Sequence, residues 1–269
     1  MFSIEEIDKC RIQHFSKYPE IQPGDVFAFL SKSSQEMLFQ VCRNSRKQIE
    51  SELISATALF FHQFYLRESI LDFDPRVVVV CCMNLAAKTE EYHSVSLPDL
   101  VNALPESAVF KAEVPLIEMK LLAALDFNLV VEQPWLIILY WVELFRIATG
   151  DESHAELFNK ACNVMQAWQW TDAVLVFPFP QLATAAVLRA AIICNQHGSG
   201  SPDDDTSAFR ILTKIHCERL PGVNVEKLLL SIETIVSRFG PNDRVAKDPA
   251  WESTAGLKKL KQLLDSSKV

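Results

Sequence analysis

The feature that most constrains the fold is one apolar pattern that occurs twice along the chain. Residues 65–86 align without a gap against residues 170–191, and Pro75 then falls opposite Pro180. In both copies the proline is followed by a long, almost uncharged stretch. A repeat of this length indicates two similar structural units in tandem, each built around one central buried element. We interpret these as two five-helix units.

The central element of the first copy reads as a helix or as a strand. Four consecutive valines, Val77 to Val80, would suit a buried strand, and periodicity alone leaves that alternative open. The length of the segment and its continuation from Met83 to Lys88 favour a helix, and Pro75 suits its first turn. The chain also has only 7 glycines, too few for an architecture rich in tight turns. We therefore predict an all-α fold.

Further helices are predicted from apolar spacing and start signals. Ser3 with Glu6, and Ser96 with Asp99, have capping-box spacing. Pro23-Gly24 indicates an extended connector over 21–31, so the next helix is expected to begin near Ser34. Residues 198–205 read as an exposed loop that ends in three aspartates of no assigned role. The expected helices are 3–17, 34 to before 51, 53–66, 75–88, 97–104, 116–125, 135–147, 154–169, 180–194, 207–217, 223–239 and 251–264.

Charge and composition exclude several classes of protein. The net charge of −8 and the pI near 5.3 argue against a direct nucleic-acid ligand. The first residues lack a signal-peptide pattern, and no apolar run reaches membrane-spanning length, so we expect an intracellular protein that does not bind membranes. The 7 cysteines have no framework spacing, as expected for reduced thiols.

No residue pattern predicts catalysis, a metal or a cofactor. Phosphate-binding loops, nucleophile elbows and metalloprotease helices are all missing from the sequence. A zinc set made of Cys194, His197, His216 and Cys217 is disfavoured because neither pair has a ligand spacing. We expect neither an enzyme nor a bound cofactor.

The two copies differ where their central helices end. The first ends in Lys88-Thr89-Glu90-Glu91, whereas the second continues apolar through Ile193-Cys194. A charge at the end of a buried helix must be exposed, paired or used at an interface. Lys88 is therefore either a solvated helix terminus or a group that contacts a partner.

At these residues the chain resembles the cyclin family. The segment Leu85 to Glu91 is similar to the family signature at the end of the third helix of the first cyclin box, and Phe64 to Ser69 is similar to the end of the second. Glu118 with the leucines that follow it resembles the fifth helix, and Thr171 to Val176 resembles a second-box signature. No docking signature of the cell-cycle type is found at Met37 to Val41. The resemblance covers nearly the whole chain.

The resemblance implies two tandem cyclin boxes flanked by terminal helices. On this reading residues 1–33 are an N-terminal helix and connector, 34–131 the first, kinase-binding box, 132–240 the second box and 241–269 a C-terminal helix. The family's kinase-binding residues carry over, position by position, to Lys88 and Glu118 as polar contacts and to Leu85, Leu122 and Phe127 as apolar contacts. In the alternative reading Glu118 is a first-turn carboxylate stabilised by its helix dipole, and the apolar residues belong to the core.

The partner implied is a cyclin-dependent kinase, most closely one like cyclin-dependent kinase 7. In that branch of the family the complex is the kinase-activating component of TFIIH, joined by an assembly factor, and it phosphorylates other such kinases and the RNA polymerase II tail in the nucleus. The branch that serves the Mediator kinase module is the alternative. A DNA-binding transcription adaptor of the factor-B type shares the fold but would require clustered basic residues.

Overall fold

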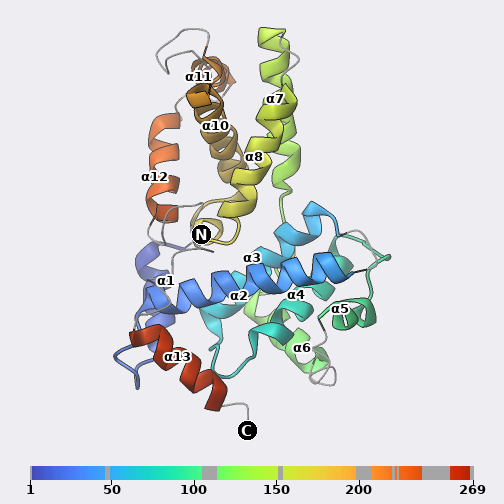
Figure 1. Ribbon diagram of the computed structural model, residues 1–269, viewed down its shortest axis with the longest axis vertical. Helices are drawn as coiled ribbons and strands as arrows, with labels where there is room; N and C mark the ends of the chain where they lie inside the picture. Colours follow the sequence, from blue (N-terminus) through green and yellow to red (C-terminus); the bar gives the residue numbers. More distant parts are fainter. Residues whose placement is uncertain are drawn as a thin grey trace. The chain divides into compact units, whose positions relative to one another are not determined.

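A computed structural model of the chain describes residues 2–45, 49–104, 114–150, 154–197, 207–219, 222, 224–237 and 255–266. All regular secondary structure in this part of the chain is helical, which confirms the predicted all-α class. The chain divides into two compact units (Figure 1). Unit 1 comprises Met1–Val131 with Phe239–Val269, and unit 2 comprises Glu132–Arg238.

Unit 1 is organised around the central helix that the repeat predicted. Its helices are α1 (Ile4–Gln13), α2 (Pro23–Asn44), α3 (Ser51–Arg67), α4 (Pro75–Thr89), α5 (Leu97–Ala103), α6 (Val114–Ala124) and α13 (Ala255–Ser266). Helix α4 contacts α2, α3, α5 and α6 (Figure 1), and every residue from Val77 to Ala87 is buried. The run of four valines is therefore helical, because neighbours on all sides cover a helix that is apolar all round.

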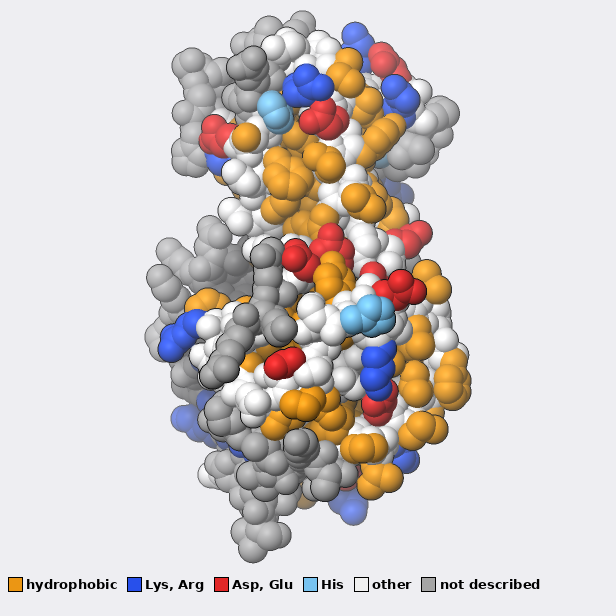
Figure 2. All heavy atoms as spheres, turned by 90° about the vertical axis from the view of Figure 1, so that its right-hand side faces the viewer, with side chains coloured by type: hydrophobic (Ala, Val, Ile, Leu, Met, Phe, Trp, Pro, Cys, Tyr) orange, Lys and Arg blue, Asp and Glu red, His pale blue; other side chains and the backbone are white. Residues whose placement is uncertain are grey.

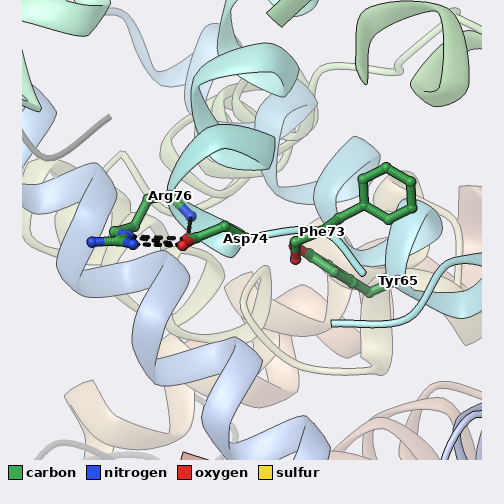
Figure 3. A network of polar contacts seen from close by, with 4 residues as sticks. All are labelled: Tyr65, Phe73, Asp74 and Arg76. Atoms are coloured by element: carbon green, nitrogen blue, oxygen red, sulfur yellow. Dashed lines mark hydrogen bonds and ion pairs between the residues drawn. The ribbon is translucent and has the colours of Figure 1, made fainter. Parts of the chain in front are cut away.

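A polar network fixes the point where α4 begins. The Asp74 carboxylate accepts a hydrogen bond from the Arg76 backbone N–H at 2.9 Å and also pairs with the Arg76 guanidinium (Figure 3). Beside it the buried Tyr65 hydroxyl donates to the Phe73 carbonyl oxygen at 2.9 Å, which ties the end of α3 to the start of α4. These bonds satisfy groups that the end of a buried helix would otherwise leave unpaired.

Both predicted capping boxes of unit 1 are present, but the start of α2 was predicted wrongly. Ser3 with Glu6, and Ser96 with Asp99, cap α1 and α5 as expected. Residues 21–31 are not an extended connector, because α2 already begins at Pro23. A proline at the first helical position needs no hydrogen bond to its nitrogen, and Asp25 caps the turn by accepting from the Gln22 backbone N–H at 3.0 Å.

The terminal helices cover α2 and α3. Ile7 and Phe15 lie in the core, whereas Ile12 is 49% exposed and Cys42 on α2 is exposed. Helix α13 packs on α2 and buries Leu260 completely. The acidic loop at 203–205 and the helix start predicted at Trp251 lie outside the described residues. Within the described chain, no helix combines the length and the apolar character needed to cross a bilayer.

Unit 2 repeats the arrangement with a second central helix. Its helices are α7 (Pro134–Thr149), α8 (His154–Trp168), α9 (Ala173–Val176), α10 (Phe179–His197), α11 (Ala208–Arg219) and α12 (Val225–Ser237). Helix α10 contacts every other helix of the unit, as α4 contacts most of unit 1. The short helix α9 was not predicted. Gly150 caps the end of α7, and its φ of 66° suits a residue without a side chain.

A buried histidine joins α11 to α7 in unit 2. The His216 ring is 2% exposed and stacks on Trp141, with the ring centroids 5.2 Å apart. Trp141 in turn donates from Nε1 to the Thr184 hydroxyl on α10 at 3.1 Å. Burial lowers the pKa of His216 because a charged imidazolium loses its solvation there.

This environment predicts that unit 2 loses stability in mild acid. In the unfolded chain a histidine takes up its proton near pH 6.5, below which the unfolded state binds more protons than the folded one. The stability that neutral His216 provides is therefore fully present above about pH 6.5 and falls below it, by at most about 1.4 kcal/mol per pH unit. His216→Phe keeps the stack and should flatten this dependence.

Urea titrations at pH 7.5 and 5.5, followed by tryptophan fluorescence, would measure the effect. Of the 5 tryptophans, all but Trp251 lie between residues 135 and 170, so the signal reports mainly on unit 2. His93→Phe is the control, because His93 is exposed in unit 1. An unchanged pH dependence in His216→Phe would contradict the prediction.

Candidate functional site

The exposed end of α4 carries the first charged side chain after its buried run. Lys88 is 56% exposed, and its ammonium group forms an ion pair with the Glu118 carboxylate on α6. Glu118 lies in the second turn of α6, since that helix begins at Val114. This position does not support the alternative reading of Glu118 as a first-turn carboxylate, because a helix dipole acts mainly within the first turn.

Three contacts from α4 hold Glu118 and the start of α6. The Asn84 amide donates to the second Glu118 oxygen at 3.5 Å, and the Cys81 thiol lies 3.8 Å from the Val114 carbonyl oxygen. The pKa of Cys81 is raised to about 12, first by burial and then by the nearby negative charge of Glu118. The glutamate side chain is only 20% exposed, so the protein fixes it while Lys88 projects into solvent.

Large apolar side chains are exposed on α6 and in the segment after it. On α6, Leu116 is 73% and Met119 is 63% exposed, and beyond the helix Phe127 is 67% and Val130 is 84% exposed. Figure 2 shows a face on which many hydrophobic side chains are exposed. Large exposed apolar side chains on one unit are typical of a surface that another molecule covers.

The turn after α6 is a Schellman cap built without glycine. The Phe127 N–H donates to the Leu122 carbonyl oxygen at 3.0 Å, and the Asp126 N–H donates to that of Ala123 at 3.1 Å. Asp126 has φ 50° and Phe127 has φ 57°, both left-handed. For a bulky residue such as phenylalanine this conformation costs about 1–3 kcal/mol. Phe127, the second residue of this cap, is 67% exposed.

All five candidate residues lie in unit 1, in three different environments. Lys88 and Glu118 are brought together, and Phe127 is exposed near them in the chain. Leu122 is half-buried on α6. Leu85 is only 4% exposed, so it belongs to the core of the unit.

Several residues of this surface were missed by sequence reasoning. Leu116 and Met119 had no usable signal, because α6 is apolar on both sides of Glu118 and such a pattern does not say which face the core covers. The ion pair between Arg67 and Asp126 had no signal, since the partners are 59 residues apart.

The second copy lacks the corresponding pair. Alignment places Ile193 opposite Lys88, and α10 continues to His197 without a charged residue at this position. Across the described residues of both units, no cluster of three or more His, Cys, Asp or Glu could hold a metal ion. The geometry at Lys88 suits recognition: one exposed cation is paired with one fixed carboxylate, and the same unit exposes large apolar side chains on α6 and after it.

The family model and the relatives that match this chain all carry the name cyclin. Residues 5–130 match the family model described as "Cyclin, N-terminal domain". Cyclin-C1-1 of Oryza sativa subsp. japonica is 27% identical over 165 residues, which cover 58% of this chain and 61% of the rice protein. Cyclin-H1-1 of Arabidopsis thaliana is 30% identical over 194 residues, which cover 69% of this chain and 54% of the Arabidopsis protein.

A solved structure shares the fold of the whole chain. It is the CAK complex from Chaetomium thermophilum bound to ATP-gamma-S, with a TM-score of 0.72 and 17% identity over 99% of this chain and 84% of the matched one. At this identity the likeness shows the fold alone. The chain spans little more than half the length of the rice and Arabidopsis relatives that it matches.

The exposure of Lys88 predicts that its ion pair contributes little to folding. Lys88→Met should change the free energy of unfolding by less than about 1 kcal/mol, since exposed ion pairs are weak. Leu121→Ala on α6, where the side chain is 0% exposed, should cost about 2–5 kcal/mol. Chemical denaturation of both variants measures this, and a comparable loss for the two would mean that Lys88 is structural.

Proposed function

We propose that this chain, whose residues 5–130 match the cyclin N-terminal domain, is a cyclin: the regulatory subunit of a cyclin-dependent protein kinase, which it binds through the surface around Lys88. The observation that carries the proposal is the Lys88–Glu118 pair at the exposed end of an otherwise buried helix. The exposed apolar side chains on α6 and in the segment after it supply the area that a stable protein contact needs.

The charge pair is suited to specificity more than to raw affinity. In the free chain Lys88 and Glu118 neutralise one another, so the surface meets its partner without an unpaired charge. Both groups keep further hydrogen-bonding capacity, because an ammonium group has three donors and a carboxylate accepts from several directions. A partner with backbone or side-chain groups at the matching positions completes these bonds, and other partners leave them unmet.

Activation on this proposal is a population shift in the kinase. A kinase is active when a glutamate on its mobile C-helix pairs with the lysine that binds ATP. A surface that binds only this conformation of the C-helix raises its population by the difference in affinity for the two states. The chain supplies binding energy and orientation, and the chemical step belongs to the kinase.

Within the family we propose the cyclin H role. The kinase is then one like cyclin-dependent kinase 7, with other cyclin-dependent kinases and the RNA polymerase II tail as substrates, in TFIIH and in the nucleus, with an assembly factor as a further partner. Similarity to Cyclin-H1-1 supports this, and similarity to Cyclin-C1-1 makes the Mediator kinase module the alternative. Residues 34–131 are proposed as the kinase-binding box and 132–240 as the second box.

A DNA-binding adaptor is the alternative from another class. A chain with net charge −8 has little attraction for phosphates, so a salt-dependent DNA-binding assay should detect no complex. A complex that weakens steeply with salt would favour the adaptor.

Co-expression with candidate kinases tests the proposal. The native chain should bind and activate a kinase of the activating type, and Lys88→Glu should reduce activation about tenfold or more, because it places two carboxylates side by side. Glu118→Ala should also weaken binding, since it leaves Lys88 without its fixed partner.

Lys160→Glu is the control, because Lys160 also pairs with a glutamate, Glu156, within α8 of unit 2, and one partner of that pair is 65% exposed. It should leave activation within about twofold of the native chain. Activation of only a Mediator-type kinase would select the alternative branch, and no binding to any kinase would overturn the proposal.

A further inference from the structure

A guanidinium group on α3 holds the cap at the end of α6. Arg67 Nη1 donates to Asp126 Oδ1 at 2.7 Å, and Nη2 pairs with Oδ2, so the contact is bidentate. The same Nη1 lies 3.4 Å from the Ala123 carbonyl oxygen, which already accepts from the Asp126 N–H. One side chain therefore contacts both ends of the reverse turn.

Arg67 binds Asp126, and Asp126 occupies the position of the cap at which glycine is usual. In a Schellman cap the residue after the helix adopts the left-handed conformation, and here this residue is Asp126. Aspartate tolerates this conformation better than most side chains, but glycine costs nothing there. The bidentate contact with Arg67 compensates by fixing the carboxylate in the one geometry that the turn provides.

The turn determines where Phe127 lies. A Schellman cap commonly includes an apolar contact between the second residue after the helix and the residue that accepts its N–H bond. Here these are Phe127 and Leu122, which were both predicted as partner contacts. If the turn opened, Phe127 would leave its left-handed conformation, and its ring would point elsewhere.

We propose that Arg67 is a positioning residue for partner binding: by clamping Asp126 it fixes the left-handed turn that presents Phe127 to the kinase. The proposal rests on the proposed function, because Phe127 acts only if a kinase covers this surface. Arg67 acts through the backbone of residues 126 and 127. The Arg67 side chain is 42% exposed and that of Asp126 is 70% exposed, so the pair adds little to folding.

The first test is made in the free chain, without a kinase. Arg67→Met keeps the length of the side chain and removes the clamp. Hydrogen exchange at the Phe127 amide, which is bonded to Leu122, should become about tenfold faster, while Leu121 and the core of α6 stay protected. Unchanged exchange at Phe127 would overturn the inference whatever the chain binds.

The second test is a double-mutant cycle on kinase affinity. Phe127→Ala should weaken binding about tenfold, as expected for an aromatic contact. Arg67→Met should weaken binding about threefold to tenfold in the native chain and less than twofold in the Phe127→Ala background. Equal losses in the two backgrounds would mean that Arg67 does not act through Phe127.

Substitutions of Asp126 separate the turn from its charge. Asp126→Asn tolerates the left-handed conformation and still accepts from Arg67, so binding should stay within about threefold of the native chain. Asp126→Val disfavours the turn and removes the acceptor, so binding should fall about tenfold. Similar affinity of the two variants would overturn the inference.

Arg146→Met is the matched control, since Arg146 pairs with Glu143 within α7 at similar exposure. It should change neither exchange at Phe127 nor kinase affinity. A native chain that binds no kinase overturns the proposed function, and the inference with it. A native chain that binds, with Arg67→Met indistinguishable from it, overturns only the inference.

Discussion

Burying a helix on every side requires other helices around it, and this requirement governs unit 1. Helix α4 is buried from Val77 to Ala87, so α2, α3, α5 and α6 must all pack against it. Each fully buried valine or leucine contributes about 1.5–3 kcal/mol relative to exposure, which makes this arrangement far more favourable than any that exposes α4. The helix reaches solvent only at its ends, and polar groups are placed there: the Asp74 cap at the start and Lys88 at the finish.

The surface around Lys88 follows from how α4 and α6 end. Three non-glycine residues in the described chain have positive φ, namely Glu91, Asp126 and Phe127, and all follow one of these two helices. The backbone N–H of Tyr92 donates to the Ala87 carbonyl oxygen at 2.8 Å, and the backbone N–H of Phe127 makes the same kind of bond to the Leu122 carbonyl oxygen. Strained backbone persists only where its surroundings stabilise it, and it concentrates at functional sites. Its position here agrees with a role of this surface in binding.

The two copies share an architecture but not this surface. Helix α10 is surrounded in unit 2 as α4 is in unit 1, yet it carries Ile193 where α4 carries Lys88. Packing requires an apolar central helix in both units. It does not determine which residue stands where that helix reaches the surface. The charge at Lys88 is therefore not explained by folding, and this contrast is what makes it a candidate for partner recognition.

The sequence determined what depends on local pattern: the helical class, the repeat, both central helices, and the capping boxes at Ser3 and Ser96. These follow from spacing within a few turns or from comparison of the two copies, whereas the role of Lys88 and Glu118 follows from the family resemblance and stays a prediction. It misplaced the start of α2, because Pro23-Gly24 suits a turn as well as a first helical turn. Tertiary structure alone decided that Leu85 is core, that Leu116 and Met119 are exposed, and that Arg67 meets Asp126 across 59 residues. The reason is physical: which face of an apolar helix stays uncovered, and which charges meet across the chain, depend on how the helices pack together.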